Sequence, residues 1–253
     1  MDLETRQLKQ KLSHADALPE VLFLKPITTS TNDDVREVAL KGVNTVLICS
    51  RQQTQGRGQQ KRQWVSPEGN IYLSTLLNVQ IPIDGRLALE IALNITQMPS
   101  LEALNINVKW PNDLYFKQKK LGGILIEPIS SNQAIVGVGI NLTPIQDDAI
   151  QHCTTSLQEI GLQQIDRISL IAELYLAIQQ AGQWFDHQCY NLGARFNHHA
   201  AFINQQIVLE HQNGQIQGLF LGIQDDGSLQ IKTPNGVEIF YQGRLRLNQP
   251  SEE

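Results

Sequence analysis

The sequence predicts an α+β fold in two domains, one over residues 1–199 and a smaller one over residues 200–253. In the first part, strand-like apolar runs alternate with segments of helical spacing, which predicts a sheet with flanking helices. After residue 199 only short β runs follow, separated by Asn-Gly and Asp-Gly pairs that are typical of hairpins. This pattern predicts a small β-barrel, and a chain of 253 residues has room for both parts.

Apolar runs bounded by turn residues predict the strands. In the first domain we expect them at residues 21–24, 45–49, 71–77, 106–110, 114–116, 123–127 and 134–141. The fifth and sixth runs should pair through a turn at residues 117–120. In the second domain we expect strands at residues 207–209, 216–223, 229–232, 237–241 and 245–247.

Four segments have apolar residues at helical spacing. They lie at residues 3–12, 31–42, 85–104 and 154–197. For the second segment, Ser30 or Thr31 is a suitable N-cap, acidic residues fill the first turn, and Gly42 is expected to end the helix. Pro99 should kink the third helix or end its first part, because proline lacks the backbone N–H.

Composition limits the classes of function. The formal net charge of -5 and the pI of about 5.7 argue against a dedicated nucleic-acid binder, which is usually basic. No apolar run is long enough to span a bilayer, and the N-terminus lacks the apolar core of a signal peptide. The three cysteines are far apart and lack metal-ligand spacing, which indicates reduced thiols in a cytoplasmic protein.

A basic loop at residues 50–64 carries four cationic residues and no acidic one. Glycines on both sides of Arg57 allow positive φ, or a close approach of a ligand to the backbone amides. The loop lies between two predicted strands, where a rigid scaffold often holds binding residues. These features favour a site for a carboxylate or a phosphate. The alternative is a mobile, solvated loop, against which the closing Trp64 argues.

Three further segments offer polar groups that would converge with the basic loop. They are Ser30-Thr31-Asn32, Lys109-Trp110-Pro111-Asn112-Asp113 and Lys120-Leu121-Gly122-Gly123. Each has a structural alternative: the hydroxyls would only cap a helix, the tryptophan would only pack, and Lys120 would be an exposed hairpin lysine. The sequence has neither a Gly-x-x-x-x-Gly-Lys phosphate loop nor a Gly-x-Ser-x-Gly nucleophile motif.

Five segments, in this order and spacing, resemble the bacterial biotin protein ligases. They are Thr29-Ser30-Thr31-Asn32, residues 53–64, residues 109–113, residues 120–123 and Gly137-Val138-Gly139-Ile140-Asn141. Each motif alone is weak or moderate, but five in register are specific, and the resemblance extends from residue 20 to the end of the chain. It implies a mixed-sheet domain of the class II synthetase type with flanking helices, followed by an SH3-like β-barrel.

The resemblance also implies a reaction in two steps. Biotin and ATP give biotinyl-5′-AMP and pyrophosphate, and a lysine of a biotin carboxyl carrier protein of acetyl-CoA carboxylase then takes the biotin. Mg²⁺ would accompany ATP, with Asp113 as its candidate ligand. Alignment and charge stabilisation would be the work of Lys120, Arg57, Arg62 and Asp113.

The same resemblance implies two sets of binding residues. The biotin site would consist of Ser30, Thr31, Asn32, Gln53, Arg57, Gly58, Gln59 and Lys120. The ATP site would consist of Arg57, Arg62, Trp64, Asn112 and Asn141. Neutral donors and acceptors suit the uncharged ureido ring of biotin, and Trp64 would cover the adenine.

Two departures from the family pattern carry expectations. The family's loop is typically Gly-Arg-Gly-Arg-x-Gly-Arg, whereas here Gln59 replaces an arginine and Lys61 replaces a glycine. We expect the adenylate to be held less tightly than with arginine, with partial compensation by Lys61. Many members also carry an N-terminal winged helix that binds operator DNA, for which the residues before the first motif are too few. We therefore expect a ligase without a repressor role and without specific DNA binding.

Two other interpretations of the chain remain. A lipoate-type ligase shares the fold and the adenylate chemistry, but its apolar lipoyl tail would leave Gln53 and the Ser-Thr-Asn segment without a purpose. A non-catalytic module would bind phosphate or nucleic acid through the basic loop and a partner through the barrel. The barrel would be either a structural cap or an aid to ATP or carrier binding. Exposed sheet edges would support a homodimer.

Overall fold

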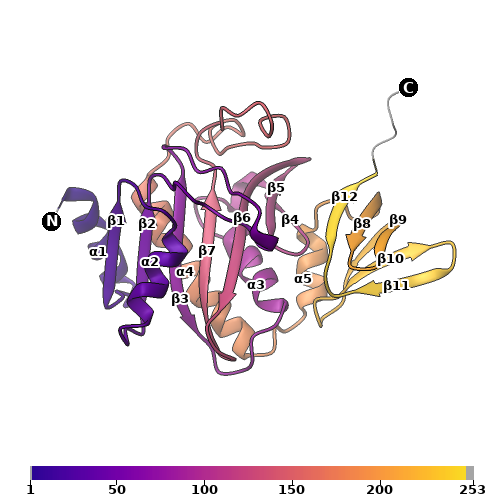
Figure 1. Cartoon of the computed structure of the whole chain (residues 1–253), viewed down its shortest axis with the longest axis horizontal. Coiled ribbons are helices and arrows are strands. Elements are labelled where there is room, and N and C mark those ends of the chain that lie inside the picture. The colour runs from indigo at the N-terminus through magenta and orange to yellow at the C-terminus, as the bar shows by residue number, and fades with distance from the viewer. Residues whose placement is uncertain (1, 249–253) are drawn as a thin grey trace.

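The computed structural model describes residues 2–248, and a seven-stranded sheet is its centre (Figure 1). Its strands are β1 (Val21–Lys25), β2 (Val46–Ser50), β3 (Ile71–Asn78), β4 (Asn107–Lys109), β5 (Asp113–Phe116), β6 (Lys119–Pro128) and β7 (Gln133–Ile140). They lie in the order β1-β2-β3-β7-β6-β5-β4. Only β1 and β2 pair in parallel, so the sheet is mixed, and the seven strands predicted for this part are confirmed.

Helices cover both faces of this sheet. Their bounds are α1 (Leu3–His14), α2 (Thr31–Ala39), α3 (Arg86–Thr96) and α4 (Arg167–Asp186). In Figure 1, α3 and α4 lie behind the sheet, α1 packs on α4 at one end, and α2 lies in front. The front face therefore carries a single short helix, and this leaves room for the basic loop on the same side.

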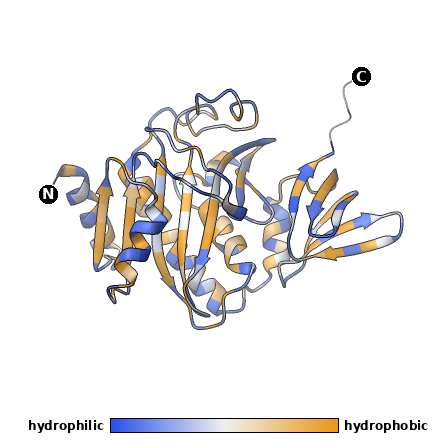
Figure 2. Ribbon diagram, viewed as in Figure 1, coloured by the Kyte–Doolittle hydropathy of each residue, from blue (hydrophilic) through white to orange (hydrophobic). Residues whose placement is uncertain are grey.

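Strand β2 shows how the sequence produces two layers. Side chains alternate between the faces of a sheet, so neighbouring apolar residues of a buried strand enter different cores. Leu47 and Cys49 belong to the main core with the rear helices, whereas Val46 and Ile48 pack with Val35 of α2. All residues of β2 are buried, and Figure 2 shows hydrophobic colour along the central strands. A strand covered on both faces has an unbroken run of apolar residues in the sequence, and this run made β2 predictable.

A second sheet follows α5 (Leu192–His199). Its strands are β8 (Gln206–His211), β9 (Gly214–Ile223), β10 (Leu229–Thr233), β11 (Gly236–Phe240) and β12 (Arg244–Leu247). They lie in the order β11-β10-β9-β8-β12 with antiparallel pairing throughout, so the five predicted β runs are confirmed. The domain boundary at residue 200 stays a prediction.

Hydrogen bonds hold the segment before the second sheet, and one turn of that sheet, against the end of β4. The backbone N–H of Ala201 donates to Val108 O at 2.9 Å. The indole Nε1 of Trp110, which is buried, donates to Gly227 O at 3.0 Å. The predicted alternative, that this tryptophan only packs, is thus partly right. Its side chain is buried, but its hydrogen bond also fixes the position of the polar segment that follows it.

The predicted helix boundaries were wrong at two ends and in one interior stretch, residues 187–191, which form a turn between α4 and α5. The third helix ends at Thr96, just before Pro99, in agreement with the expectation that Pro99 ends its first part, but only a 3-10 turn at Glu102–Leu104 follows it. Residues 154–166 form turns, and α4 begins only at Arg167. Asp166 decides that start, because its carboxylate accepts from the backbone N–H groups of Ile168 and Ser169.

The predicted turn at residues 117–120 is also too long. In the register of β5 and β6, Phe116 pairs with Lys119 and Tyr115 with Lys120, which leaves a two-residue turn. Lys117 takes a positive φ of 54° in that turn. Lys120 therefore stands on a strand, not in a turn, and its side chain has a defined direction.

Residues 2–248 contain no helix that is both long enough and apolar enough to cross a membrane. The longest helix, α4, has 20 residues, but it lies against the sheet and shares the main core. Its apolar residues are therefore used in the packing of the domain.

Candidate active site

A cavity of about 410 Å³ opens on the front of the larger sheet, beneath the basic loop. Every residue that the sequence predicts for the site lines this cavity. They are Ser30, Thr31, Asn32, Gln53, Arg57, Gly58, Gln59, Arg62, Trp64, Asn112, Asp113, Lys120 and Asn141. The fold thus brings together segments that are more than one hundred positions apart in the chain, and the individual roles of these residues stay predictions.

One part of the cavity lining, which we call the neutral wall, consists of Thr31, Asn32 and Gln53, and the buried Ser74 supports it from behind. Gln53 Oε1 accepts from the backbone N–H of Thr31 at 2.9 Å and from its hydroxyl at 3.1 Å. Ser74 Oγ lies 2.6 Å from both Thr31 Oγ1 and Asn32 Oδ1. Asn32 Nδ2 is buried without a hydrogen-bond partner in the described structure, so it is free to donate to a ligand.

A glycine makes room for this wall. Gly137 of β7 pairs with Ser74 of β3, and a Cβ on Gly137 would lie 2.3 Å from Asn32 Oδ1. No real Cβ approaches an oxygen so closely, so any other residue would push Asn32 out of place. This close approach explains one of the two strand glycines that the sequence singles out.

The basic loop folds into a short hairpin over the cavity. Trp64 N donates to Gly56 O at 2.9 Å, and Gly58 N donates to Arg62 O at 2.8 Å. The positive φ expected at the glycines is found instead at Gln60, whose φ is 55°. Gly56 is needed for a close approach, because a Cβ there would lie 2.4 Å from Ser66 Oγ.

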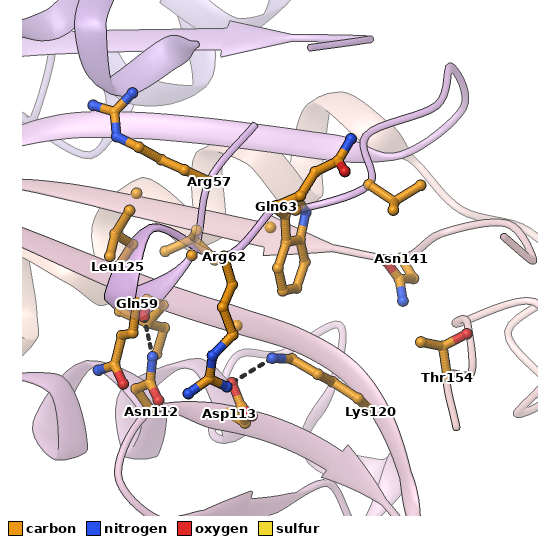
Figure 3. A pocket seen from close by; sticks show the side chains of 18 of the residues that line it. Arg57, Gln59, Arg62, Gln63, Asn112, Asp113, Lys120, Leu125, Asn141 and Thr154 are labelled. Atoms are coloured by element: carbon orange, nitrogen blue, oxygen red, sulfur yellow. Dashed lines mark hydrogen bonds and ion pairs between the residues drawn. The ribbon is translucent and has the colours of Figure 1, made fainter. Parts of the chain in front are cut away.

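Arg57 is the residue whose surroundings differ most from expectation. Its guanidinium binds Asp33 through two nitrogens at 2.8 and 2.6 Å and Glu127 through two at 2.8 and 3.0 Å. A further bond of 3.2 Å reaches Ser30 Oγ. In Figure 3 its side chain points away from Arg62 and Lys120. Arg57 therefore anchors the base of the hairpin, and its expected contact with substrate stays a prediction.

The charges around Arg57 reinforce one another. Hydrogen bonds from Arg57 to Asp33, and then to Glu127, raise the pKa of the guanidinium above its usual value. Burial acts to raise the pKa of Glu127, but the bonds from Arg57 and the neighbouring Arg36 lower it overall. The acidic residues of the first turn of α2 thus do more than complement the helix dipole, because one of them holds the loop.

Another part of the cavity lining, which we call the cationic end, consists of Arg62, Lys109, Lys120 and Arg244. Asp113 is the only acidic side chain among the described residues of the cavity lining. Lys120 Nζ lies 2.6 Å from Asp113 Oδ1 and 4.8 Å from the centre of the Trp64 ring. Figure 3 shows Arg62 extended toward this pair. Cations outnumber carboxylates here, which suits a ligand with several negative charges.

Trp64 lies flat on a platform made by two glycines. Gly123 of β6 and Gly139 of β7 face each other in register. A Cβ on Gly123 would come within 3.1 Å of the indole, and one on Gly139 within 2.8 Å. The indole Nε1 is buried without a partner in the described structure. The two glycines thus let the indole of the basic loop pack into the cavity lining, where an adenine ring would meet it.

Two asparagines cross-link the strands beside this platform. Asn112 Nδ2 donates to Ile124 O, and Asn141 Nδ2 donates to Thr155 O at 3.0 Å. Asn141 Oδ1 is buried and has no partner in the described structure. Each amide therefore has a structural bond, and Asn141 keeps one acceptor for a ligand.

The donors present fit Mg²⁺ only as a companion of phosphates. The described residues contain no group of three or more His, Cys, Asp or Glu side chains that would hold a metal ion alone. Mg²⁺ is commonly bound through one or two carboxylates together with substrate phosphates. Asp113 provides one carboxylate at the cationic end of the cavity, although one of its oxygens forms an ion pair with Lys120.

Sequence reasoning missed two cations of the site. Lys109 belongs to the predicted motif at residues 109–113, but the sequence assigned it to neither the biotin site nor the ATP site. Its Nζ donates to Tyr115 Oη at 3.1 Å. Burial lowers the pKa of Lys109 to about 8, against the opposing charge of Asp113. Arg244 comes from the second sheet, and no local pattern around it indicated a site.

Comparison with known proteins identifies the family. The model of the biotin/lipoate A/B protein ligase family matches residues 24–141, and that of the biotin protein ligase C terminal domain matches residues 202–251. The bifunctional ligase/repressor BirA of Salmonella typhimurium is 30% identical over 233 residues, which cover 88% of this chain and 72% of that protein. The biotin–[acetyl-CoA-carboxylase] ligase of Paracoccus denitrificans is 27% identical over 241 residues, with 85% and 98% covered.

A solved structure agrees with these relatives. The biotin protein ligase from Aquifex aeolicus, in complex with biotin and ATP, superimposes with a TM-score of 0.78 at 27% identity. The match covers 91% of this chain and 100% of that one, so both sheets are included. The chain belongs to the biotin/lipoate A/B protein ligase family, in which its matched relatives include biotin protein ligases.

Proposed function

We propose that the protein is a biotin protein ligase, which uses ATP to join biotin to a lysine of a biotin carboxyl carrier protein. The observation that carries this proposal is the division of one cavity into a neutral wall and a cationic end. The neutral wall suits an uncharged ureido ring, and the cationic end suits a carboxylate that must meet a triphosphate. Family membership supports the same assignment.

In the first step, a carboxylate oxygen of biotin attacks the α-phosphorus of ATP. The new oxygen–phosphorus bond forms as the bond to the bridging oxygen of the β-phosphate breaks, and pyrophosphate leaves with the electron pair. Lys120 and Arg62 would offset the charge on the reacting groups, because fixed cations stabilise developing charge. Lys120 has three N–H donors, so it can contact Asp113 and an anion together.

In the second step, the amine of the carrier lysine attacks the acyl carbon of biotinyl-5′-AMP, an amide forms, and AMP leaves. Water would compete for the same carbon, and the hairpin of the basic loop covers the cavity against it. Neither step requires a covalent bond to the protein. Alignment of the reactants is therefore the main contribution of the site. Mg²⁺ bound with ATP would add positive charge at the phosphates, with Asp113 as its protein ligand.

A lipoate-type ligase would use the cationic end in the same way but not the neutral wall. Thr31 and Asn32 of that wall are at most 4% exposed, and buried polar groups favour a ligand that completes their hydrogen bonds. An apolar lipoyl tail would leave Asn32 Nδ2 without a partner. This observation favours biotin.

Transfer of labelled biotin to a purified biotin carboxyl carrier domain tests the proposed function. We expect labelling that requires ATP, releases pyrophosphate and is not supported by lipoate in place of biotin. Labelling with lipoate at a similar rate would reassign the chain to lipoate chemistry. Pyrophosphate release that does not depend on either acid would contradict a ligase of this type.

We further propose that the protein acts in the cytoplasm and without specific DNA binding. Its overall negative charge supports the second point, because operator binding relies on a basic surface. A mobility-shift assay with a biotin-operon operator should show no specific complex. The homodimer expected from exposed sheet edges stays a prediction, which sedimentation velocity with and without biotinyl-5′-AMP would test.

A further inference from the structure

The side chain of Arg57 uses all of its hydrogen-bonding capacity within the protein. A guanidinium has five N–H donors in a fixed geometry. Nε and Nη2 donate to Glu127 at 2.8 and 3.0 Å, and Nη1 and Nη2 donate to Asp33 at 2.8 and 2.6 Å. Nη1 also donates to Ser30 Oγ at 3.2 Å. Every N–H of the group thus has a protein partner, and a substrate anion would have to displace one of them.

The two carboxylates, Asp33 and Glu127, form what we call the carboxylate clamp. Asp33 lies in the first turn of α2, and Glu127 lies near the end of β6, so the clamp joins two rigid elements. Its members differ in exposure, with 52% for the side chain of Asp33 and 20% for that of Glu127. Arg36 also binds Glu127 at 3.1 Å. Two cations therefore face two carboxylates, and the cluster is neutral without a ligand.

The clamp holds the outer part of the basic loop, residues 57–63. Backbone bonds to the segment before α2 hold only the start of the loop. Among the hydrogen bonds that the structure describes for residues 57–63, only those of the Arg57 side chain reach a segment outside the loop. Arg57 faces Gln63 across the hairpin. Its position therefore also fixes the returning arm, which carries Arg62 and Trp64 into the cavity lining.

Closure of the hairpin brings like charges together. Arg62 joins Lys120 and Arg244 in the cavity lining. Burial, followed by the charges of Arg246 and Arg62, lowers the pKa of Arg244. Before an anionic ligand binds, this repulsion favours an open loop. In Figure 3, Arg57 and Arg62 point in opposite directions from the hairpin, so attraction at the clamp can oppose repulsion at the cationic end.

We propose that Asp33 and Glu127 are positioning residues of the ligase, which act through Arg57 to hold the hairpin closed over biotinyl-5′-AMP. Closure would set how long the adenylate is retained and how well water is kept from its acyl carbon until the carrier lysine arrives. Water that attacked this carbon would break its bond to the phosphate oxygen and return biotin and AMP. The inference rests on the proposed function and deepens it, because it names the residues that protect the intermediate.

The direction of a mutational effect separates this role from a direct contact with substrate. If Arg57 bound a substrate anion, Asp33 and Glu127 would compete with that anion, and neutral side chains in their place would strengthen binding. If Arg57 tethers the hairpin, it needs both carboxylates, and neutral side chains would loosen the loop. The two roles thus predict opposite changes in the retention of the adenylate.

The test measures the release of biotinyl-5′-AMP from its preformed complex. We expect about tenfold faster release in Glu127→Gln, the size of a lost hydrogen bond to a charged group. The effect should be about threefold in Asp33→Asn, because water screens the more exposed pair. Pyrophosphate release without carrier should rise in the same order, because adenylate that is lost to water is made again.

Asp34→Asn is the matched control. It removes the same charge from the same turn of α2, but Asp34 binds Lys25 at 2.8 Å and makes no contact with the hairpin within the described residues. It should change the release rate by no more than about twofold.

A double-mutant cycle shows whether the clamp acts through Arg57. Arg57→Ala should release the adenylate at least as fast as Glu127→Gln, and Glu127→Gln should add little to it. Arg57→Lys should restore only part of the retention, because an ammonium group cannot bind both carboxylates in the bidentate manner of a guanidinium. Circular dichroism checks that each variant is folded, and the exposure of Asp33 makes Asp33→Asn the safeguard should Glu127→Gln unfold.

The outcomes separate the clamp from the proposed function. Unchanged or slower release in Glu127→Gln and Asp33→Asn, or equal acceleration in Asp34→Asn, would overturn the clamp. Independent, additive effects of Arg57→Ala and Glu127→Gln would do the same. If the unsubstituted protein forms no biotinyl-5′-AMP from biotin and ATP, the proposed function itself fails.

Discussion

The neutral wall and the cationic end of the cavity are built in opposite ways. In the neutral wall, Thr31 and Gln53 bind each other and Ser74 supports Thr31 from behind, so the side chains have their final positions before a ligand arrives. At the cationic end, Arg62, Lys109 and Arg244 come from three separate elements; in the described structure Arg62 and Lys109 form no ion pair, and Arg244 has only a 3.9 Å pair with Glu210. Dipoles can satisfy one another within the protein, whereas like charges can be satisfied only by a ligand. The first region is therefore preorganised, whereas the second brings like charges together, and we expect an anionic substrate to offset their repulsion.

The largest effect is expected at the cationic end, for Lys120→Ala. Removal of a fixed cation at the reacting phosphate should slow adenylate formation by ~100- to 1,000-fold at saturating substrates. The measurement is single-turnover release of pyrophosphate. Lys117→Ala is the control, because Lys117 lies in the adjoining turn, outside the cavity lining. Equal losses in both variants would show that general charge, not the position of Lys120, matters.

Gln53→Leu tests the neutral wall. Leucine leaves the backbone N–H of Thr31 unpaired, so biotin affinity should fall by about 1–3 kcal/mol. The KM for ATP should stay within about twofold, because the substitution replaces one uncharged side chain with another and leaves the cationic end intact. Isothermal titration calorimetry with biotin gives the first value, and Gln52→Leu, outside the cavity lining, is the control. A loss of ATP affinity of the same size would contradict the division of the cavity into two regions.

Gly139→Ala probes the platform that joins the two regions. The new Cβ would lie 2.8 Å from the Trp64 indole, so the ring must shift at a cost of about 1–3 kcal/mol. We expect a higher KM for ATP, with biotin affinity little changed. Gly85→Ala is a matched control, since a Cβ there meets nothing within 4 Å. Normal ATP kinetics in Gly139→Ala would exclude Trp64 from the nucleotide site.

The smallest effect is expected for Gln59→Arg, which adds a cation to the loop over the cavity. An extra charge-assisted hydrogen bond should slow release of biotinyl-5′-AMP by about three- to tenfold. Release is measured by stopped flow after dilution of the preformed complex, with Gln55→Arg, on the outer part of the loop, as the control. No slowing would mean that Gln59 does not loosen the adenylate.

The sequence predicted best those elements in which a single cause, such as burial on both faces of a sheet, produces the pattern of apolar residues. Residues 46–49 are covered on both faces, so each of these positions is apolar and the strand is evident. Residues 154–166 failed because Leu157 and Ile160 have helical spacing but pack from turns against the core. Apolar spacing reports which residues are buried, and only the backbone hydrogen bonds decide whether a helix buries them.

The lengths of turns and the directions of side chains were also beyond local patterns. Lys120 was expected in a four-residue turn, but strand register extends β6 to Lys119 and places Lys120 on the strand. Register is set by the pairing of both strands along their length, not by the turn residues alone.

By itself, the sequence determined which segments carry the site and which of them are neutral or charged. Chemistry of that kind belongs to single residues and their neighbours in the chain. Only the tertiary structure decided which charges face the ligand. Asp33 and Glu127 hold the guanidinium of Arg57 at the edge of the cavity lining, while the second sheet brings Arg244 to the cavity. The direction of a long charged side chain depends on partners that are distant in sequence, because the nearest opposite charge in space competes with the ligand.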